Sequence, residues 1–82
     1  MADVTYFVAL PFIPSEDGVA PGEPVECTNA NAAIIRAEML SRKSEYAGAI
    51  AFSRSGDPDV GEFKDAVMIR AFGVVPGDLS AL

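Results

Sequence analysis

Two features near the middle of the chain carry side chains that could bind a ligand. Residues 53–56 read SRSG and offer two hydroxyls, one guanidinium and the backbone amides of a turn. Successive N–H groups in a turn form an anion-binding concavity, and Arg pairs well with carboxylate and phosphate. Arg70 lies in an apolar run and needs an acid, solvent or a ligand, because an unpaired buried charge is costly. The candidate ligand-binding residues are therefore Ser53, Arg54, Ser55, Gly56 and Arg70.

A plainer interpretation competes with this anion site. The same four residues could be a hairpin connection whose serines hydrogen-bond to their own backbone. The stretch lacks the spacing of a P-loop, so the motif alone is weak evidence for phosphate binding. We regard the simple connection as the stronger interpretation.

Acidic residues follow directly, at positions 57, 59, 62 and 65. Clustered carboxylates suit calcium or magnesium, and paired carboxylates can act as acid and base. The spacing does not match an EF-hand, and Asp57-Pro58 is typical of a turn.

The chain has no histidine and one cysteine. Cys27 precedes a helix and could be an activated thiolate, but a small buried hydrophobe is the simpler role. We predict no metal, no cofactor and no catalytic residues, although carboxylate and Arg chemistry leave the question of an enzyme open.

Composition limits the class of protein. The chain has 82 residues, half of them apolar, and a formal net charge of −6. This length predicts a single domain, residues 1–82, and the acidic charge argues against nucleic-acid binding. Residues 1–10 lack the basic region of a signal peptide, and no apolar run reaches the length needed to cross a bilayer. We expect a bacterial cytoplasmic protein without membrane contact.

The order of predicted elements gives the expected fold. Residues 5–12 and 47–53 read as strands, and residues 12–24 as a long Pro/Gly-rich loop with a turn at 16–18. A helix capped by Thr28 or Asn29 runs to about Ser44. Residues 54–61 read as a turn and a third strand ends before Pro76, followed by a tail (76–82) that forms one helical turn or frays. The fold class is α+β: a two-layer β-α-β-β arrangement with a three-stranded, mostly antiparallel sheet of order 1-3-2 and one main helix on one face.

Patterning assigns faces to these elements. One stripe of the helix is rich in alanine and consists of Ala30, Ala33, Ile34, Ala37, Leu40 and Ser41. This stripe is expected to pack on Ile50, Phe52, Val67 and Ile69, leaving the other sheet face bare. Exposed apolar faces of this size usually form interfaces, and twofold dimers are the commonest outcome. Ile35 and Met39 form a second apolar patch on the helix, which either tucks under the long loop or contacts a partner. The candidate interface residues are Ile35, Met39, Met68 and Phe72.

Residues 47–76, AGAIAFSRSGDPDVGEFKDAVMIRAFGVVP, resemble a group of small uncharacterised alphaproteobacterial proteins. The shared pattern is AFSR-(S/T)-GDP followed by GE-(F/Y)-x-DAV. The resemblance implies a bacterial cytosolic protein and no particular activity or ligand.

Two functions remain open from the sequence. The first is a small interaction or regulatory module that acts as a homodimer without catalysis, with a different protein as a further possible partner. The alternative is a small-molecule or anion-binding protein that uses residues 53–56 and Arg70. An enzyme is the least supported class, because no catalytic spacing is recognisable.

Overall fold

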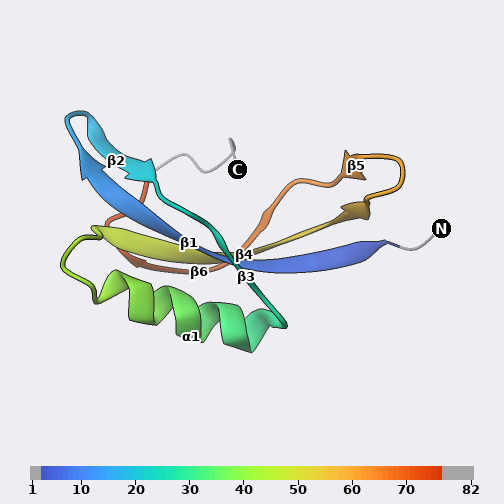
Figure 1. Ribbon diagram of the computed structural model, residues 1–82, viewed down its shortest axis with the longest axis horizontal. Helices are drawn as coiled ribbons and strands as arrows, with labels where there is room; N and C mark the ends of the chain where they lie inside the picture. Colours follow the sequence, from blue (N-terminus) through green and yellow to red (C-terminus); the bar gives the residue numbers. More distant parts are fainter. Residues whose placement is uncertain (1–2, 77–82) are drawn as a thin grey trace.

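A computed structural model describes residues 3–76, and over this range six strands form one antiparallel sheet with a helix against one face (Figure 1). The strands are β1 (Val4–Ser15), β2 (Gly18–Pro21), β3 (Val25–Cys27), β4 (Gly48–Asp57), β5 (Glu62–Phe63) and β6 (Val67–Gly73). The helix, α1, spans Ala30–Ser41. Residues 77–82, which make up most of the predicted tail, lie outside the described range.

The two long strands β1 and β4 form the centre of the sheet. They pair with each other from Val4↔Gly56 to Phe12↔Gly48. Strands β2 and β3 share the outer edge of β1, and β5 and β6 share the outer edge of β4. The predicted three-stranded sheet of order 1-3-2 is therefore wrong. The third predicted strand corresponds to β6, which lies at an edge rather than at the centre.

The helix belongs to a crossover that starts at β3 and not at β1. Both β3 and β4 run antiparallel to β1, so they are parallel to each other. The chain passes from β3 through α1 to β4, and β1 lies between these two strands. This is a split β-α-β unit, in which the connection skips one strand.

Strand β1 extends beyond the predicted residues 5–12 and contains both Pro11 and Pro14. Pro11 cannot donate a hydrogen bond to a neighbouring strand, so we expected the strand to end near it or to lie at an edge of the sheet. In the structure the Pro11 carbonyl accepts a 2.8 Å bond from Gly22 N–H, at the point where the partner of β1 changes from β2 to β3. The expected long loop is instead a hairpin, β1 with β2, whose turn at Glu16 and Asp17 leads into Gly18, with φ of 132°.

Helix α1 begins where the sequence predicted. The Asn29 side-chain oxygen accepts a 2.8 Å bond from Ala32 N–H and so satisfies one free donor of the first turn. Glu38 and Arg42 form the expected ion pair one turn apart, at 3.3 Å. The helix ends at Ser41 instead of Ser44, and residues 42–46 form the turns that lead to β4.

Small side chains fill the contact between α1 and the sheet. Ala33 and Ala37 from the helix are fully buried against three alanines of the two central strands: Ala9, Ala49 and Ala51. Leu40 also belongs to this cluster, and Ile69 and Phe72 are among the partly buried residues that pack against it. The prediction for β4 was wrong, because Ile50 and Phe52 point away from the helix. Side chains alternate along a strand, so a shift of one residue moves every side chain to the opposite face.

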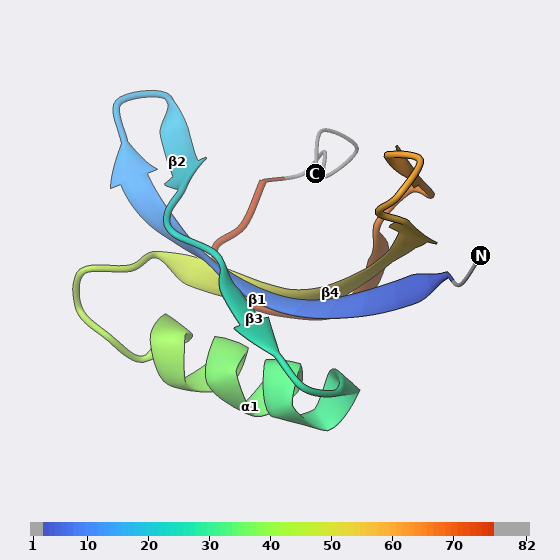
Figure 2. The ribbon, with the colours of Figure 1, turned by 45° about the vertical axis from the view of Figure 1, so that its right-hand side comes forward.

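The larger side chains lie on the face away from α1. Leu10, Phe12, Ile50 and Phe52 form a second cluster, and each is less than one-tenth exposed. Both ends of the sheet bend toward this side, so the face is concave (Figure 2). Val19, Ala66 and Val75 pack against the cluster from the surrounding segments. The expectation of a bare second face is wrong at its centre, since a single chain already buries these side chains.

Candidate functional site

The stretch 53–56 is part of strand β4 and not a turn. Its residues alternate between the two faces of the sheet. Ser53 lies opposite Phe7, and Ser55 Oγ is 2.8 Å from Thr5 Oγ1, while Arg54 lies between them on the opposite face. The hydroxyls and the guanidinium therefore do not converge. The stretch cannot form the amide-lined cradle that its composition suggested, because an extended strand directs successive N–H groups to opposite edges.

The two candidate cations lie on opposite faces of the sheet. Arg54 lines the concave face next to Phe52. Arg70 lies opposite Ala51 in β6, with its guanidinium carbon 5.8 Å from the ring centre of Phe72, which packs on the helix side. The predicted anion site is thus divided in two, and Arg70 is exposed to solvent, so its charge needs no buried partner.

Gly56 has a structural role at the end of β4. It is buried and pairs with Phe63 of β5. An added Cβ would lie 2.5 Å from Phe63 Cδ1 and closer still to the Glu62 carbonyl oxygen. Glycine therefore allows β5 to approach β4 at this position, and ligand binding is not needed to explain the residue.

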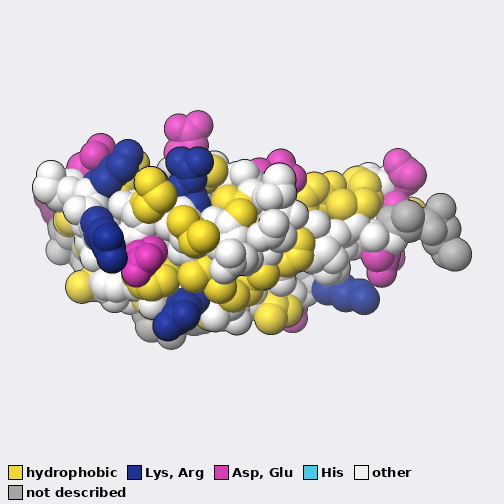
Figure 3. Space-filling model, turned by 90° about the horizontal axis from the view of Figure 1, so that it is seen from below, with side chains coloured by type: hydrophobic (Ala, Val, Ile, Leu, Met, Phe, Trp, Pro, Cys, Tyr) yellow, Lys and Arg dark blue, Asp and Glu magenta, His cyan; other side chains and the backbone are white. Residues whose placement is uncertain are grey.

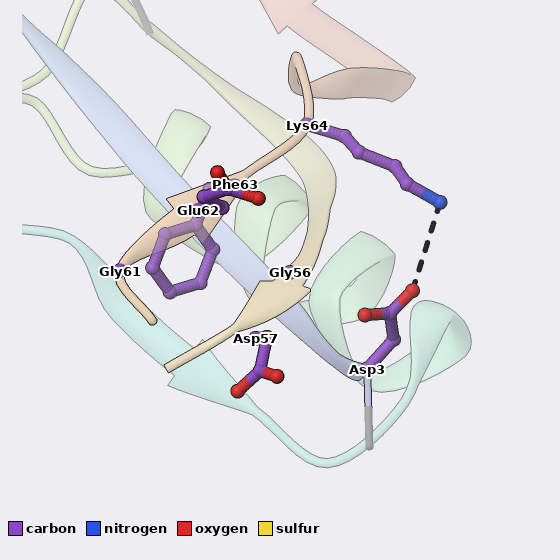
Figure 4. A pocket seen from close by; sticks show the side chains of 7 residues that line it. All are labelled: Asp3, Gly56, Asp57, Gly61, Glu62, Phe63 and Lys64. Carbon is purple, nitrogen blue, oxygen red and sulfur yellow. Dashed lines mark ion pairs between the residues drawn. The ribbon is translucent and has the colours of Figure 1, made fainter. Parts of the chain in front are cut away.

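A shallow hollow of about 510 Å³ lies where β4 and β5 meet the start of β1 (Figure 4). Its lining residues are Asp3, Gly56, Asp57, Gly61, Glu62, Phe63 and Lys64. Lys64 Nζ lies 3.7 Å from Asp3 Oδ2, and both side chains are well exposed. Asp57 Oδ1 accepts a 2.9 Å bond from Asp59 N–H, which is the turn that Asp57-Pro58 predicted. Within residues 3–76, no group of three acidic or thiol side chains is arranged to hold a metal ion.

Cys27 lies at the end of β3 and is partly buried against the alanine cluster under the helix. Its thiol donates a weak 3.6 Å bond to the carbonyl of Val25, two residues earlier. This environment agrees with the role of a small packing residue.

The four predicted interface residues do not share one surface. Ile35 and Met39 are about half exposed on the helix, so the expected cover from the long loop is absent among the described residues. Hydrophobic side chains gather along the middle of the helix side of the molecule (Figure 3). Met68 lies opposite Phe52 on the other sheet face, and Phe72 is partly buried beneath the helix.

A second hollow, which sequence analysis missed, lies on the concave face. It has a volume of about 380 Å³ and is lined by Tyr6, Val8, Pro24, Phe52, Arg54 and Phe63. The register pairs Tyr6 with Arg54 and Val8 with Phe52, so β1 and β4 supply the floor together. Alternation along each strand places Tyr6 and Val8 on one face of β1, and Phe52 and Arg54 on one face of β4. Only the pairing of β1 with β4 shows that these two pairs of side chains share a face of the sheet.

Comparison with known proteins gives no relative. No protein-family model matches the chain. A search of curated proteins finds no match, and a search of solved structures finds none either. Among the described residues, no helix is long and apolar enough to cross a membrane.

Proposed function

We propose that this protein is a non-catalytic interaction module that associates with a second copy of itself through strand β6. The supporting observation is the open edge of this strand. β6 pairs with β4 on one side, and no other strand of residues 3–76 pairs with its second side. An unpaired strand edge presents a row of N–H and C=O groups that another chain can join.

Strand β6 is the longest of the edge strands. It has seven residues, whereas β2, β3 and β5 have four, three and two. Its sequence, VMIRAFG, contains no proline and a single charged residue, Arg70. Natural edges are commonly protected by lysine, proline or a strong bulge. β6 has one register shift against β4, next to Phe52, so this protection is slight.

Exposed apolar side chains accompany the open edge. Val67 is 62% exposed and Met68 is 40% exposed, in a strand that pairs with β4 along its other side at every residue except Ile69. Pairing β6 with its own copy about a twofold axis would bury these side chains and satisfy the free backbone groups in a closed dimer. The open edge of β6, rather than a bare sheet face, supports self-association. Met68 remains an interface residue, whereas Phe72 is partly buried beneath the helix of the same chain.

The helix patch formed by Ile35 and Met39 is the second candidate contact, for a protein of a different kind. The two residues are one helical turn apart and both are at least half exposed.

We further propose a cytoplasmic location, which the acidic composition and the single cysteine support.

The oligomeric state tests the proposal. Size-exclusion chromatography with light scattering should give twice the mass of one chain at tens of micromolar protein. Val67→Lys places a charge on the edge strand and should shift the protein to monomer. Val60→Lys is the matched control, because Val60 is 66% exposed in the turn before β5 and should not matter. A monomeric wild-type protein at this concentration, or equal behaviour of the two variants, would contradict the proposal.

A further inference from the structure

The exposed side of helix α1 carries an apolar stripe of its own. Ala32, Ile35 and Met39 follow one another at spacings of three and four residues, which places them on one side of the helix. The opposite side, which includes Ala33 and Ala37, is buried against the sheet. Ile35 and Met39 are half exposed or more. Alternating spacings of three and four are typical of a helix that packs against a second helix.

Basic side chains flank one edge of this stripe. Arg36 directly follows Ile35, and Lys43 lies seven residues further on, in the turn after the helix. Both are exposed, and neither forms an ion pair with an acid of residues 3–76. On the other edge Glu38 pairs with Arg42 at 3.3 Å, so its charge is balanced within the chain. The charge left to a partner along this stripe is therefore positive.

This local charge is opposite in sign to that of the whole chain. Residues 30–46 hold three of the six Lys and Arg residues but two of the twelve Asp and Glu residues. Their formal charge is therefore +1, whereas the chain carries −6. Lys and Arg side chains lie beside the hydrophobic ones on this side of the molecule (Figure 3). A positive surface on an acidic protein favours a partner with negative charge at the point of contact.

We propose that the exposed side of α1 binds an amphipathic α-helix of a different protein, with acidic residues beside its apolar stripe. The partner's apolar side chains pack on Ile35 and Met39, and its carboxylates pair with Arg36 and Lys43. Charges beside an apolar seam select partners in this way in coiled coils. This inference rests on the proposed interaction module and gives the chemistry of its second contact.

A membrane or a nucleic acid fits this surface less well. Anionic bilayers are recognised by clusters of roughly four to eight Lys and Arg or by a broad apolar helix face. Here two large apolar side chains are accompanied by three basic ones, of which Arg42 is already paired. Single-stranded nucleic acid requires exposed aromatic rings for stacking. The one aromatic residue of positions 30–46, Tyr46, packs against the alanine cluster under the helix.

Titration with two synthetic peptides of three heptads tests the chemistry of the partner. Both peptides have Leu at the a and d positions; one has Glu and the other Lys at the e and g positions. The Glu peptide should shift the methyl NMR signals of Ile35 and Met39 with a Kd on the order of 100 µM, and the Lys peptide should bind about tenfold more weakly. The overall charge of −6 alone predicts the opposite order. No shifts with millimolar Glu peptide, or equal or tighter binding of the Lys peptide, would overturn the proposal.

A charge reversal on the helix then locates the contact. Arg36→Glu should weaken binding of the Glu peptide about tenfold and strengthen binding of the Lys peptide. Lys64→Glu is the matched control, because it makes the same change of charge at an exposed residue next to β5. This control should bind both peptides as the wild type does. Equal losses of Glu-peptide affinity in the two variants would show that only the overall charge matters, and would contradict the site.

Two further measurements separate this contact from other outcomes. Val67→Lys, which should be monomeric, should still bind the Glu peptide with wild-type affinity, so the dimer and the helix contact can fail independently. Wild-type protein should not sediment with phosphatidylglycerol vesicles. Binding to these vesicles in place of the Glu peptide would assign the surface to a membrane and overturn the proposal.

Discussion

Gly56 lies so close to Phe63 that a methyl group at position 56 would stand 2.5 Å from the Phe63 ring carbon Cδ1. The Phe63 ring in turn lies 6.0 Å from the Tyr6 ring, and both residues line the concave hollow. The absence of a side chain at position 56 thus lets β5 close one wall of the hollow.

Gly56→Ala should therefore displace β5 and open the hollow. We expect a loss of about 1–3 kcal/mol in unfolding free energy, the usual cost of overpacking, and altered NMR signals for Phe63 and Tyr6. Gly22→Ala is the milder comparison and should cost less, since its added Cβ would come no closer than 3.2 Å to Pro11, whereas the Cβ at position 56 would lie 2.3 Å from a backbone oxygen. Unchanged Phe63 and Tyr6 signals in Gly56→Ala would contradict this account of the wall.

The close contact between helix α1 and the sheet predicts that a larger side chain at position 37 destabilises the protein. Ala37 is fully buried between α1 and the alanines of the central strands, so there is no space for a larger side chain. Ala37→Leu should cost about 1–3 kcal/mol, and each kcal/mol lowers Tm by roughly 4–8 °C in a chain of this size. Ala32→Leu, at a partly exposed helix position outside the buried cluster, should cost much less. A stable Ala37→Leu variant would mean that the helix stands farther from the sheet.

This contact also shows where sequence analysis succeeded and failed. The stripe that includes Ala33, Ala37 and Leu40 was predicted to face the sheet, and all three are buried. The partner surface was predicted as Ile50 and Phe52, because large apolar residues were expected to cover the helix. A helix lined with alanine approaches the sheet closely, and only small residues such as Ala49 and Ala51 fit beneath it. The large residues then occupy the concave face, where space remains.

The strand order failed for a different physical reason. The sequence showed that a crossover connection leaves room for one strand between its two ends. Residues 25–27 were expected to be a short extended piece before the helix, and they are β3. The sequence did not show that this piece pairs with β1 and begins the crossover. Pro11 indicated either the end of β1 or an edge strand, yet it lies where β1 changes partners and no donor is required. Local patterning shows that a short segment is extended, but not which strand it pairs with.

Gly48 lies within strand β4, where a glycine weakens a strand unless another backbone comes close. An added Cβ would lie 2.3 Å from the Val74 carbonyl oxygen, so the backbone after β6 does come close. The candidate site was harder to predict, because Tyr6 and Arg54 are 48 positions apart and meet only through the pairing of β1 with β4.

The N-terminal cap of helix α1 predicts that loss of the Asn29 side chain lowers the free energy of unfolding, whereas a control substitution two residues later does not. Asn29→Ala removes the bond to Ala32 N–H and should cost about 1 kcal/mol. Asn31→Ala, two residues later on an exposed helical position, should be neutral or slightly stabilising, because Ala has the higher helix propensity. Thermal and urea unfolding measure both changes. Equal losses in the two variants would contradict the assignment of Asn29 as the cap.

Salt should strengthen self-association. Each chain carries a formal charge of −6, so two copies repel each other at low ionic strength. The Debye screening length falls from about 10 Å at 0.1 M salt to about 3 Å at 1 M salt. The repulsion between two chains therefore weakens, while the apolar contact at the edge does not. Sedimentation should show a larger dimer fraction at the higher salt concentration. A dimer that dissociates on addition of salt would point to an interface held by ion pairs instead.

Amide hydrogen exchange at several protein concentrations tests the pairing of β6 most directly. If two copies join through this edge, the amides of β6 that face away from β4 should exchange more slowly as concentration rises. The amides of β2, at the far edge of the sheet, should not change. Exchange rates in β6 that are the same from the most dilute to the most concentrated sample would contradict self-association through this strand.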